Sequence, residues 1–305
     1  MAFFVVALVF VMVLGFLAQT TGLCLVRGVN EAVTGKPLFL LAIIFSGSFA
    51  WIAVLAATSL DLAIPFISYQ VSSVAIVGGL LFGLGATFNN GCGVSTISKL
   101  ARGQVVMFAT ISGWLIGWLV LLFYAPTQEL VPFTISDDWH YGGLFAVSIF
   151  VALFVTRLKS PDRKIWISML LIGLMASIAF LYEAKWTPSG LLRDVSLSVW
   201  HKDPLFWPSV ERFSLAAALI GGMLIAALWS HSFKIEGANW PVVFRHLFAG
   251  ILMGVGAAVA SGGNDSQLLL ALPALSPAGG VTVLSMLSGI YLGRVLIGYF
   301  GSRVR

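Results

Sequence analysis

Residues 79–100 read GLLFGLGATFNNGCGVSTISKL, and this stretch decides how the rest of the chain is interpreted. It begins as an apolar membrane helix, stops at Asn89-Asn90-Gly91, places Cys92 at the break and restarts as a short helix over residues 93–101. Backbone that leaves helical geometry inside a bilayer must line a cavity or be buried in protein, because unpaired N–H and C=O groups are costly against lipid. The stretch therefore predicts a discontinuous helix with a thiol at its break.

The same construction returns near the C-terminus, where residues 249–272 read AGILMGVGAAVASGGNDSQLLLAL. An ungapped alignment of residues 77–96 with residues 248–267 matches seven of twenty positions. Two helices interrupted at corresponding places in two halves of a chain indicate a transporter binding site. In the second copy, Gly263 stands at the position of Cys92.

Composition places the chain in a membrane. Of its 305 residues, 59% are hydrophobic and 10% are charged, which is too apolar for a soluble fold. Apolar runs of 18 residues or more predict transmembrane helices, so we expect an all-α integral membrane protein. The net charge of +5 bears on topology rather than on partners, and nothing in the sequence suggests nucleic acid. The first cation is Arg27, which argues against a cleaved signal peptide at the N-terminus.

Charge distribution decides the number of crossings. After a first apolar helix, further spans are predicted at about residues 38–58, 72–100 (broken), 104–124, 142–156, 165–182, 212–229, 243–273 (broken) and 279–300. If both broken elements change sides, there are nine crossings, and twelve cations share one side against four on the other, with Arg294 left out as intrahelical. The twelve are Arg27, Lys36, Lys99, Arg102, Arg157, Lys159, Arg163, Lys164, Lys234, Arg245, Arg303 and Arg305. If both fold back, the division is eight against eight.

The positive-inside rule therefore predicts nine crossings, with the N-terminus outside and the C-terminus cytoplasmic. The same parity holds for a full crossing followed by a short re-entrant dip, so charge alone leaves those two geometries open. We expect one transmembrane domain over residues 1–305, with a first repeat at about 1–124, a linker crossing at about 142–156 and a second repeat at about 165–300. The odd linker crossing makes the two four-crossing repeats inverted, with their broken helices meeting near the membrane centre.

The longest connection, residues 183–211, is predicted to be a loop with too few apolar residues for a core of its own. Its tryptophans are expected at the membrane interface. The histidines fall in predicted loops or at helix ends without metal-ligand spacing, so we expect solvated or interfacial side chains. These residues are Trp186, Trp200 and Trp207, and His140, His201, His231 and His246.

The two cysteines have no CxxC spacing, so neither a disulfide framework nor a zinc site is expected. Cys92 precedes the short helix 93–101, whose free N–H groups and positive dipole end favour anions and can activate a thiol. The alternative is inert packing, which is common for buried cysteines. Cys24 follows a second apparent break at Gln19-Thr20-Thr21-Gly22, and the same two interpretations apply to it.

Polar residues at the breaks carry the remaining hypotheses. Asn90 and Ser95 either face a cavity or cap a helix. Asn264-Asp265-Ser266 opens the second short helix, where Asp265 is either a cap or a protonatable group. Arg294 either snorkels to the cytoplasmic face or offers a cation to an anionic solute.

The run Gly83-Leu84-Gly85-Ala86 with Asn90-Gly91-Cys92-Gly93, its degenerate second copy and the upstream Leu23-Cys24-Leu25 resemble the YeeE/YedE membrane proteins over essentially the whole chain. The resemblance implies an hourglass-shaped bacterial inner-membrane protein that takes up thiosulfate through transient S–H···S contacts with three cysteines. It also implies assistance by a small TusA-like cytosolic sulfur carrier. Cys24 and Cys92 match two of the three cysteines, and the third falls at Gly263, so the chain departs from the family pattern there.

The leading hypothesis is therefore a transporter without cofactor or metal that imports a small sulfur-containing anion, thiosulfate first, and is not an enzyme. One alternative is a membrane-embedded sulfur-redox enzyme or anchor that accepts a persulfide on Cys92. Another is a transporter of an unrelated solute. The expected pathway residues are Cys24, Asn90, Gly91, Cys92, Gly93, Ser95, Gly263, Asn264, Asp265, Ser266 and Arg294.

Overall fold

The structure is a computed structural model that describes residues 2–124, 130–202 and 207–303. These residues are almost entirely helical and contain no strand, only two isolated β-bridges. Nine stretches within them are long and apolar enough to cross a membrane, which confirms the predicted all-α class and number of crossings. They are Phe3–Val33, Leu38–Ser59, Ser73–Ala101, Met107–Tyr124, Trp139–Thr156, Ser160–Tyr182, Val210–Trp229, Trp240–Val259 and Pro277–Tyr299. Arg305, counted above among the cations, lies outside the described residues.

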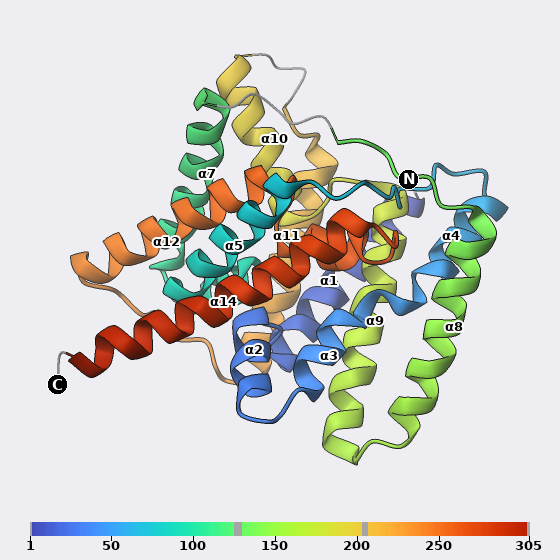
Figure 1. Ribbon diagram of the computed structural model, residues 1–305, viewed down its shortest axis with the longest axis horizontal. Helices are drawn as coiled ribbons and strands as arrows, with labels where there is room; N and C mark the ends of the chain where they lie inside the picture. The colour runs from blue at the N-terminus through green and yellow to red at the C-terminus, as the bar shows by residue number, and fades with distance from the viewer. Residues whose placement is uncertain (1, 125–129, 203–206, 304–305) are drawn as a thin grey trace.

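The helices divide into two sets of similar order, joined by α8 (Asp137–Thr156). Figure 1 shows α8 at one edge of the molecule, beside α4 and α9. The first set is α1 (Ala2–Thr21), α2 (Leu25–Val33), α3 (Leu38–Ile44), the 3-10 turn η1 (Ser46–Phe49), α4 (Ala50–Ser59), α5 (Ser73–Phe88), α6 (Gly93–Ala101) and α7 (Met107–Tyr124). The second set is α9 (Ser160–Tyr182), α10 (Pro188–His201), α11 (Val210–Trp229), α12 (Trp240–Val259), α13 (Asn264–Ser266), the π-turn η3 (Gln267–Ala271) and α14 (Pro277–Arg303).

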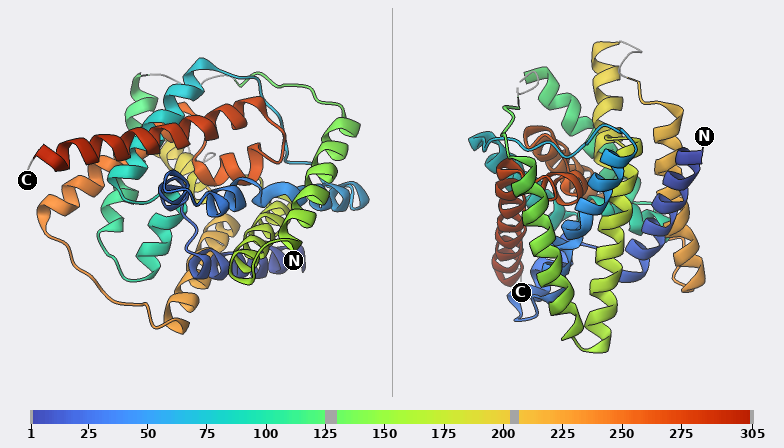
Figure 2. Two further views of the ribbon diagram at one scale, coloured as in Figure 1. Left: turned by 60° about the horizontal axis from the view of Figure 1, so that its bottom comes forward. Right: turned by 90° about the vertical axis from the view of Figure 1, so that its right-hand side faces the viewer.

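The two sets exchange partners across the centre of the molecule. α5 of the first set packs on α14 of the second, and α12 of the second packs on α7 of the first. α5 and α12 also pack on each other in antiparallel directions, because Gly78 lies against Ala260 while Gly85 lies against Ala249. A rotation that exchanges two antiparallel membrane helices has its axis in the membrane plane, as inverted repeats require. In Figure 1 and in the left view of Figure 2, the N-terminal end of α12 and the C-terminal end of α14 project on the same side.

Both α5 and α12 end in the same local structure. Asn90 and Ser261 adopt the left-handed conformation, with φ of 54° and 56°. The next N–H groups, of Gly91 and Gly262, bond back to the carbonyls of Ala86 and Ala257, both at 2.8 Å. This Schellman motif satisfies carbonyls at the helix end and turns the chain away from the helix axis. The predicted interruptions at the two aligned sites are thus confirmed.

Each short helix then folds back instead of continuing the crossing. Asn90 before α6 and Gln104 after it line the same cavity, and the Lys99 amine returns to the Asn90 carbonyl at 2.8 Å. In the second set, Ser261 before α13 and Ser276 after η3 also line one cavity. Both ends of each short helical segment therefore lie at one cavity, as expected for a re-entrant segment that follows a crossing helix.

The prediction of a loop over residues 183–211 was wrong. The segment contains α10, with Thr187 as N-cap, its hydroxyl accepting from the Gly190 N–H at 3.3 Å, and proline in the first turn. Thr-Pro is a helix-start signal that the low apolar content of the segment obscured. Trp186 is also buried, at 2% exposure, and not interfacial.

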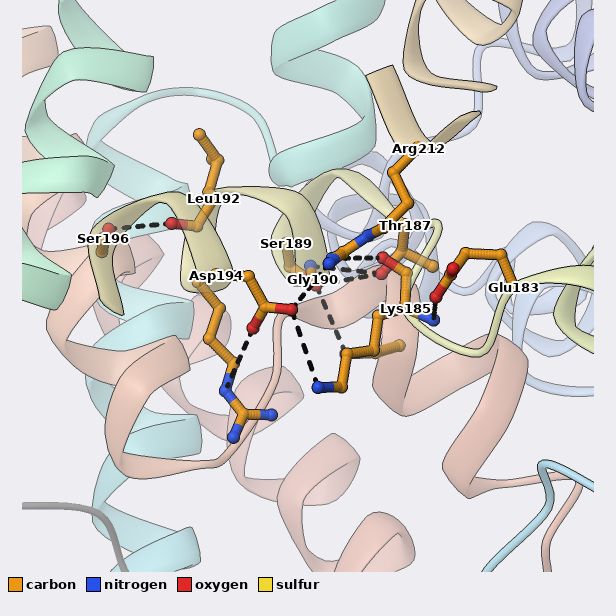
Figure 3. Close-up of polar contacts among 11 residues, drawn as sticks. Glu183, Lys185, Thr187, Ser189, Gly190, Leu192, Asp194, Ser196 and Arg212 are labelled. Atoms are coloured by element: carbon orange, nitrogen blue, oxygen red, sulfur yellow. Dashed lines mark hydrogen bonds and ion pairs between the residues drawn. The ribbon is translucent and has the colours of Figure 1, made fainter. Parts of the chain in front are cut away.

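An ion cluster holds α10 in place, as Figure 3 shows. Arg212, in the first turn of α11, donates to the Asp194 carboxylate at 2.7 Å and to the Lys185 carbonyl at 2.8 Å. Both Arg212 and Asp194 are 6% exposed. Removing one partner of a buried pair leaves an uncompensated charge, so this pair fixes the connection from α9 through α10 to α11.

Close helix packing predicts a sharp difference between two neighbouring glycines on α11. A Cβ at Gly222 would overlap the carbonyl oxygen of Met12 on α1, whereas a Cβ at Gly221 meets nothing within 4 Å. We expect Gly222→Ala to lower the melting temperature by several degrees, since overpacking costs about 1–3 kcal/mol. Gly221→Ala should leave it unchanged or raise it slightly. Thermal unfolding of the purified protein in detergent measures both, and equal melting temperatures would contradict this packing.

Candidate functional site

Four helix N-termini meet in the interior. α2 and α6 begin at Cys24 and Cys92, and α10 and α13 begin at Thr187 and Gly263. The two aligned breaks have nearly identical backbone, with φ and ψ of −78° and −178° at Cys92 and −80° and −179° at Gly263. Helix N-termini carry unpaired N–H groups and partial positive charge, so their convergence favours an anion.

The two thiols lie together between the first two N-termini. Cys24 and Cys92 are both free, 9% and 0% exposed, and lie close to each other. The Ser95 hydroxyl lies 3.7 Å from the Cys92 sulfur and also interacts with Cys24. Backbone N–H groups in the first turn of α2 lie near both sulfurs, that of Arg27 near Cys24 and that of Leu25 near Cys92. The expectation that both cysteines follow a helix break is confirmed.

The second repeat supplies caps to the helix starts around it. Asn264 Oδ1 accepts from the Gly93 N–H at 3.1 Å, and so caps α6 of the first repeat. The Asp265 carboxylate accepts from the Ser189 N–H at the start of α10 and from the Ser266 N–H, both at 2.9 Å. Asp265 therefore caps α10 as well as its own short helix. A role in proton transfer stays a prediction.

Trp114 of α7 separates the two breaks. A Cβ at Gly93 would come within 2.6 Å of its ring, and one at Gly263 within 3.1 Å. The ring is 2% exposed, packs edge-to-face on Phe82 at 5.7 Å, and its indole N–H has no hydrogen-bond partner among the described residues. Glycine at both positions is what allows the two breaks to approach the same tryptophan.

Two cavities open at opposite ends of the α5–α12 pair. A cavity of about 490 Å³ adjoins the end of α5 and is lined by Asn90, Lys99 and Arg245. A cavity of about 130 Å³ adjoins the end of α12 and is lined by Ser261 and Ser266. At the breaks themselves, Cys92, Asn264 and Asp265 line a cavity of only about 20 Å³, room for roughly one water molecule. The structure is therefore closed at the thiols.

The structure brings most of the predicted pathway residues to this constriction or to the adjoining cavities. Arg294 is different, because its guanidinium donates to the Asn30 carbonyl at 3.3 Å, near the C-terminal end of α2 and away from Cys24. Its contact with a solute stays a prediction. In the described part of the chain, no group of three or more His, Cys, Asp or Glu side chains is placed to hold a metal ion.

Sequence reasoning missed three features of the site. Trp114 gave no signal, since an apolar residue within an apolar helix predicts packing alone. Ser189 was hidden in the segment predicted to be a loop, although the break at Cys24 calls for a counterpart in the second repeat. His246 was expected to be solvated or interfacial, and this was wrong: it lies within α12 at 4% exposure, 2.7 Å from Asn89 Oδ1.

Comparison with known proteins agrees with this geometry. A family model described as sulphur transport matches the chain twice, over residues 21–159 and 154–292. The chain belongs to the sulphur transport family. The first match covers α2 to α8 and the second covers α9 to the middle of α14, which is consistent with an inverted repeat. The YeeE/YedE resemblance and the expectation of a transporter instead of an enzyme are thereby confirmed.

Two relatives carry a more specific name. The chain is 26% identical over 242 aligned positions to the thiosulfate transporter TsuA of Spirochaeta thermophila, an alignment that covers 66% of this chain and 70% of the relative. It is 21% identical over 334 aligned positions to the thiosulfate transporter TsuA of Escherichia coli, covering 93% and 92%.

Proximity of the two thiols predicts joint binding of a soft metal. We expect Cd²⁺ to raise the melting temperature of the purified protein, because two thiolates form a preferred site for soft ions. Cys24→Ala and Cys92→Ala should each weaken this effect by at least about tenfold in Cd²⁺ concentration. A Cd²⁺ response that survives either substitution would show that the thiols do not act together.

Proposed function

We propose that this protein imports thiosulfate across the bacterial inner membrane, from periplasm to cytoplasm. The observation that carries the proposal is the placement of two neighbouring thiols among helix N-termini, at a constriction, with cavities at opposite ends of the α5–α12 pair. The names of the two relatives support the choice of thiosulfate within the sulphur transport family.

The chemistry of thiosulfate fits the two halves of the constriction. The dianion has a soft terminal sulfur and hard sulfonate oxygens. The S–H groups of Cys24 and Cys92 suit the terminal sulfur, while backbone N–H groups of Gly93 and its neighbours suit the oxygens. Asn264 and Ser266 supply polar groups from the second repeat, where Gly263 replaces a thiol. Asn90, Gly91 and Ser95 shape the break beside Cys92.

The distribution of cations supports import from the periplasm to the cytoplasm. The larger cavity is lined by Lys99 and Arg245, and Arg102 and Lys234 pair through their backbones beside it. Cations gather on the cytoplasmic side of membrane proteins, which supports this cavity as the cytoplasmic exit and an N-terminus on the outside. A TusA-like cytosolic sulfur carrier, if it receives the imported sulfur, would meet the protein here.

Growth tests the proposal directly. We expect the intact chain to restore growth of a bacterium that lacks thiosulfate uptake, with thiosulfate as sole sulfur source. Cys92→Ala and Cys92→Ser should lower uptake of radiolabelled thiosulfate by at least about tenfold, because neither side chain offers a polarizable S–H. The exposed-site variant Ser59→Ala should not change it.

Two outcomes would contradict the proposed import of thiosulfate. Failure of the intact protein, when it is present in the membrane, would exclude thiosulfate as the solute. Full activity of Cys92→Ala would remove the thiol from the mechanism. Growth on cysteine serves as the control for general health of the cells.

The missing third cysteine gives a separate prediction. A Cβ at Gly263 would lie 2.8 Å from both the Ser189 Cβ and Asp265 Oδ1. We therefore expect Gly263→Cys to lower thiosulfate uptake, although it restores the family pattern, with Gly263→Ala as the size-matched control. The same uptake assay decides, and an increase with Gly263→Cys would show that the second repeat has room for a thiol.

A further inference from the structure

Three polar residues are buried beside the break that carries Cys92. Asn89 ends α5, Thr110 lies on α7 and His246 lies on α12; we call them the Asn89 cluster. Asn89 and Thr110 are 0% exposed, and His246 is 4% exposed. Asn89 Nδ2 donates to the Gly91 carbonyl at 2.9 Å and to the Thr96 hydroxyl at 2.8 Å, so the cluster holds both the residue before Cys92 and the first turn of α6.

These contacts fix the protonation of His246. The Gly91 carbonyl only accepts, so the Asn89 amide nitrogen must face it, and Asn89 Oδ1 must face Thr110 and His246, each at 2.7 Å. Oδ1 only accepts, so His246 Nδ1 carries a proton and donates it. His246 Nε2 lies 3.4 Å from the Arg245 guanidinium, which only donates, so Nε2 is unprotonated. The imidazole is therefore the neutral Nδ1–H tautomer.

Among the described residues, the other repeat has no such cluster at its break. In the register that aligns the two breaks, Asn89 and His246 correspond to Ala260 and Ala75; after a five-residue insertion that aligns Ser112-Gly113 with Ser288-Gly289, Thr110 corresponds to Met286. These residues are 5%, 8% and 0% exposed. The backbone angles at Gly263 nevertheless match those at Cys92. At that break a single buried side chain, Gln267, donates to the Ala260 carbonyl at 3.0 Å, so the break forms without a cluster that joins three helices. Since buried polar groups are costly unless fully paired, a cluster present beside the thiol alone points to a task specific to Cys92.

We propose that His246 is a positioning residue for Cys92. Its Nδ1–H orients Asn89, and Asn89 holds Gly91 and Thr96 so that the thiol faces Cys24 and the helix N-termini. His246 also lines the larger cavity, which places this support where a solute would leave the constriction. The consequence for transport rests on the proposed function, whereas the effect on the thiol does not.

The test compares substitutions that place an amide at different ring positions. His246→Asn puts an N–H near Nδ1, His246→Gln puts it near Nε2, and His246→Leu removes it. In a Cys24→Ser background Cys92 is the sole thiol, so its labelling rate by an anionic methanethiosulfonate reports its exposure directly. Uptake is measured with Cys24 intact. The exposed His231→Asn is the matched control.

We expect His246→Gln and His246→Leu to speed labelling of Cys92 and lower uptake, each by at least about fivefold, the loss of one buried hydrogen bond. His246→Asn and His231→Asn should stay within about twofold of the parent. Thr110→Val, which keeps the side-chain shape, removes another donor to Asn89 and should also speed labelling.

Equal labelling in His246→Asn and His246→Gln would overturn the proposal, as would unchanged labelling in Thr110→Val together with His246→Gln. Melting temperatures separate a local change at Cys92 from general destabilisation. An intact protein that shows the expected labelling pattern but takes up no thiosulfate would contradict the proposed function while supporting the positioning role.

Discussion

Backbone hydrogen bonding within the membrane is the constraint on which this structure depends. Where α5 and α12 end, the released carbonyls and N–H groups must find partners inside the protein, because lipid offers none. The Schellman motifs at Asn90 and Ser261 satisfy the carbonyl side. On the N–H side, two residues of the second repeat supply caps: Asn264 caps α6 of the first repeat, and Asp265 caps α10 of its own repeat. The break of the first repeat is therefore completed by a residue of the second.

The two repeats have the same backbone conformation at their breaks but carry different side chains there. Both repeats present helix N-termini to the constriction, but the first brings the thiols of Cys24 and Cys92 and the second brings Ser189, Asp265 and Ser266. One half is soft and weakly polar, and the other is a hard hydrogen-bonding surface. An anion that moves from one cavity to the other therefore exchanges one kind of partner for the other, which favours a solute with both sulfur and oxygen ends.

Local sequence was enough to predict the helix breaks and the membrane spans. Asn90 and Gly91 supply the left-handed turn and close approach that end α5, and long apolar runs define the crossings. What escaped prediction depends on contacts between distant residues. His246 is polar near a helix start, and its burial follows from Asn89, which lies 157 positions away. The apolar pattern of α10 is weak because the helix contains a buried charged residue, Asp194. This residue is accommodated only because it pairs with Arg212 inside the protein, a contact that local sequence does not reveal.

Because the structure is closed at the thiols, passage of a solute requires movement there. The long helices are joined by glycine contacts so close that a single Cβ would overlap a carbonyl, as at Gly83 against Met286 and Gly254 against Trp114. Such interfaces resist small displacements, since overpacking is costly. The breaks are held by a few hydrogen bonds, notably from Asn264 and Asp265. Under the proposed function, an anion that accepts from the N–H groups of Gly93 and Ser189 would replace those caps. Binding of the solute and release of the constriction would then be the same exchange of hydrogen bonds.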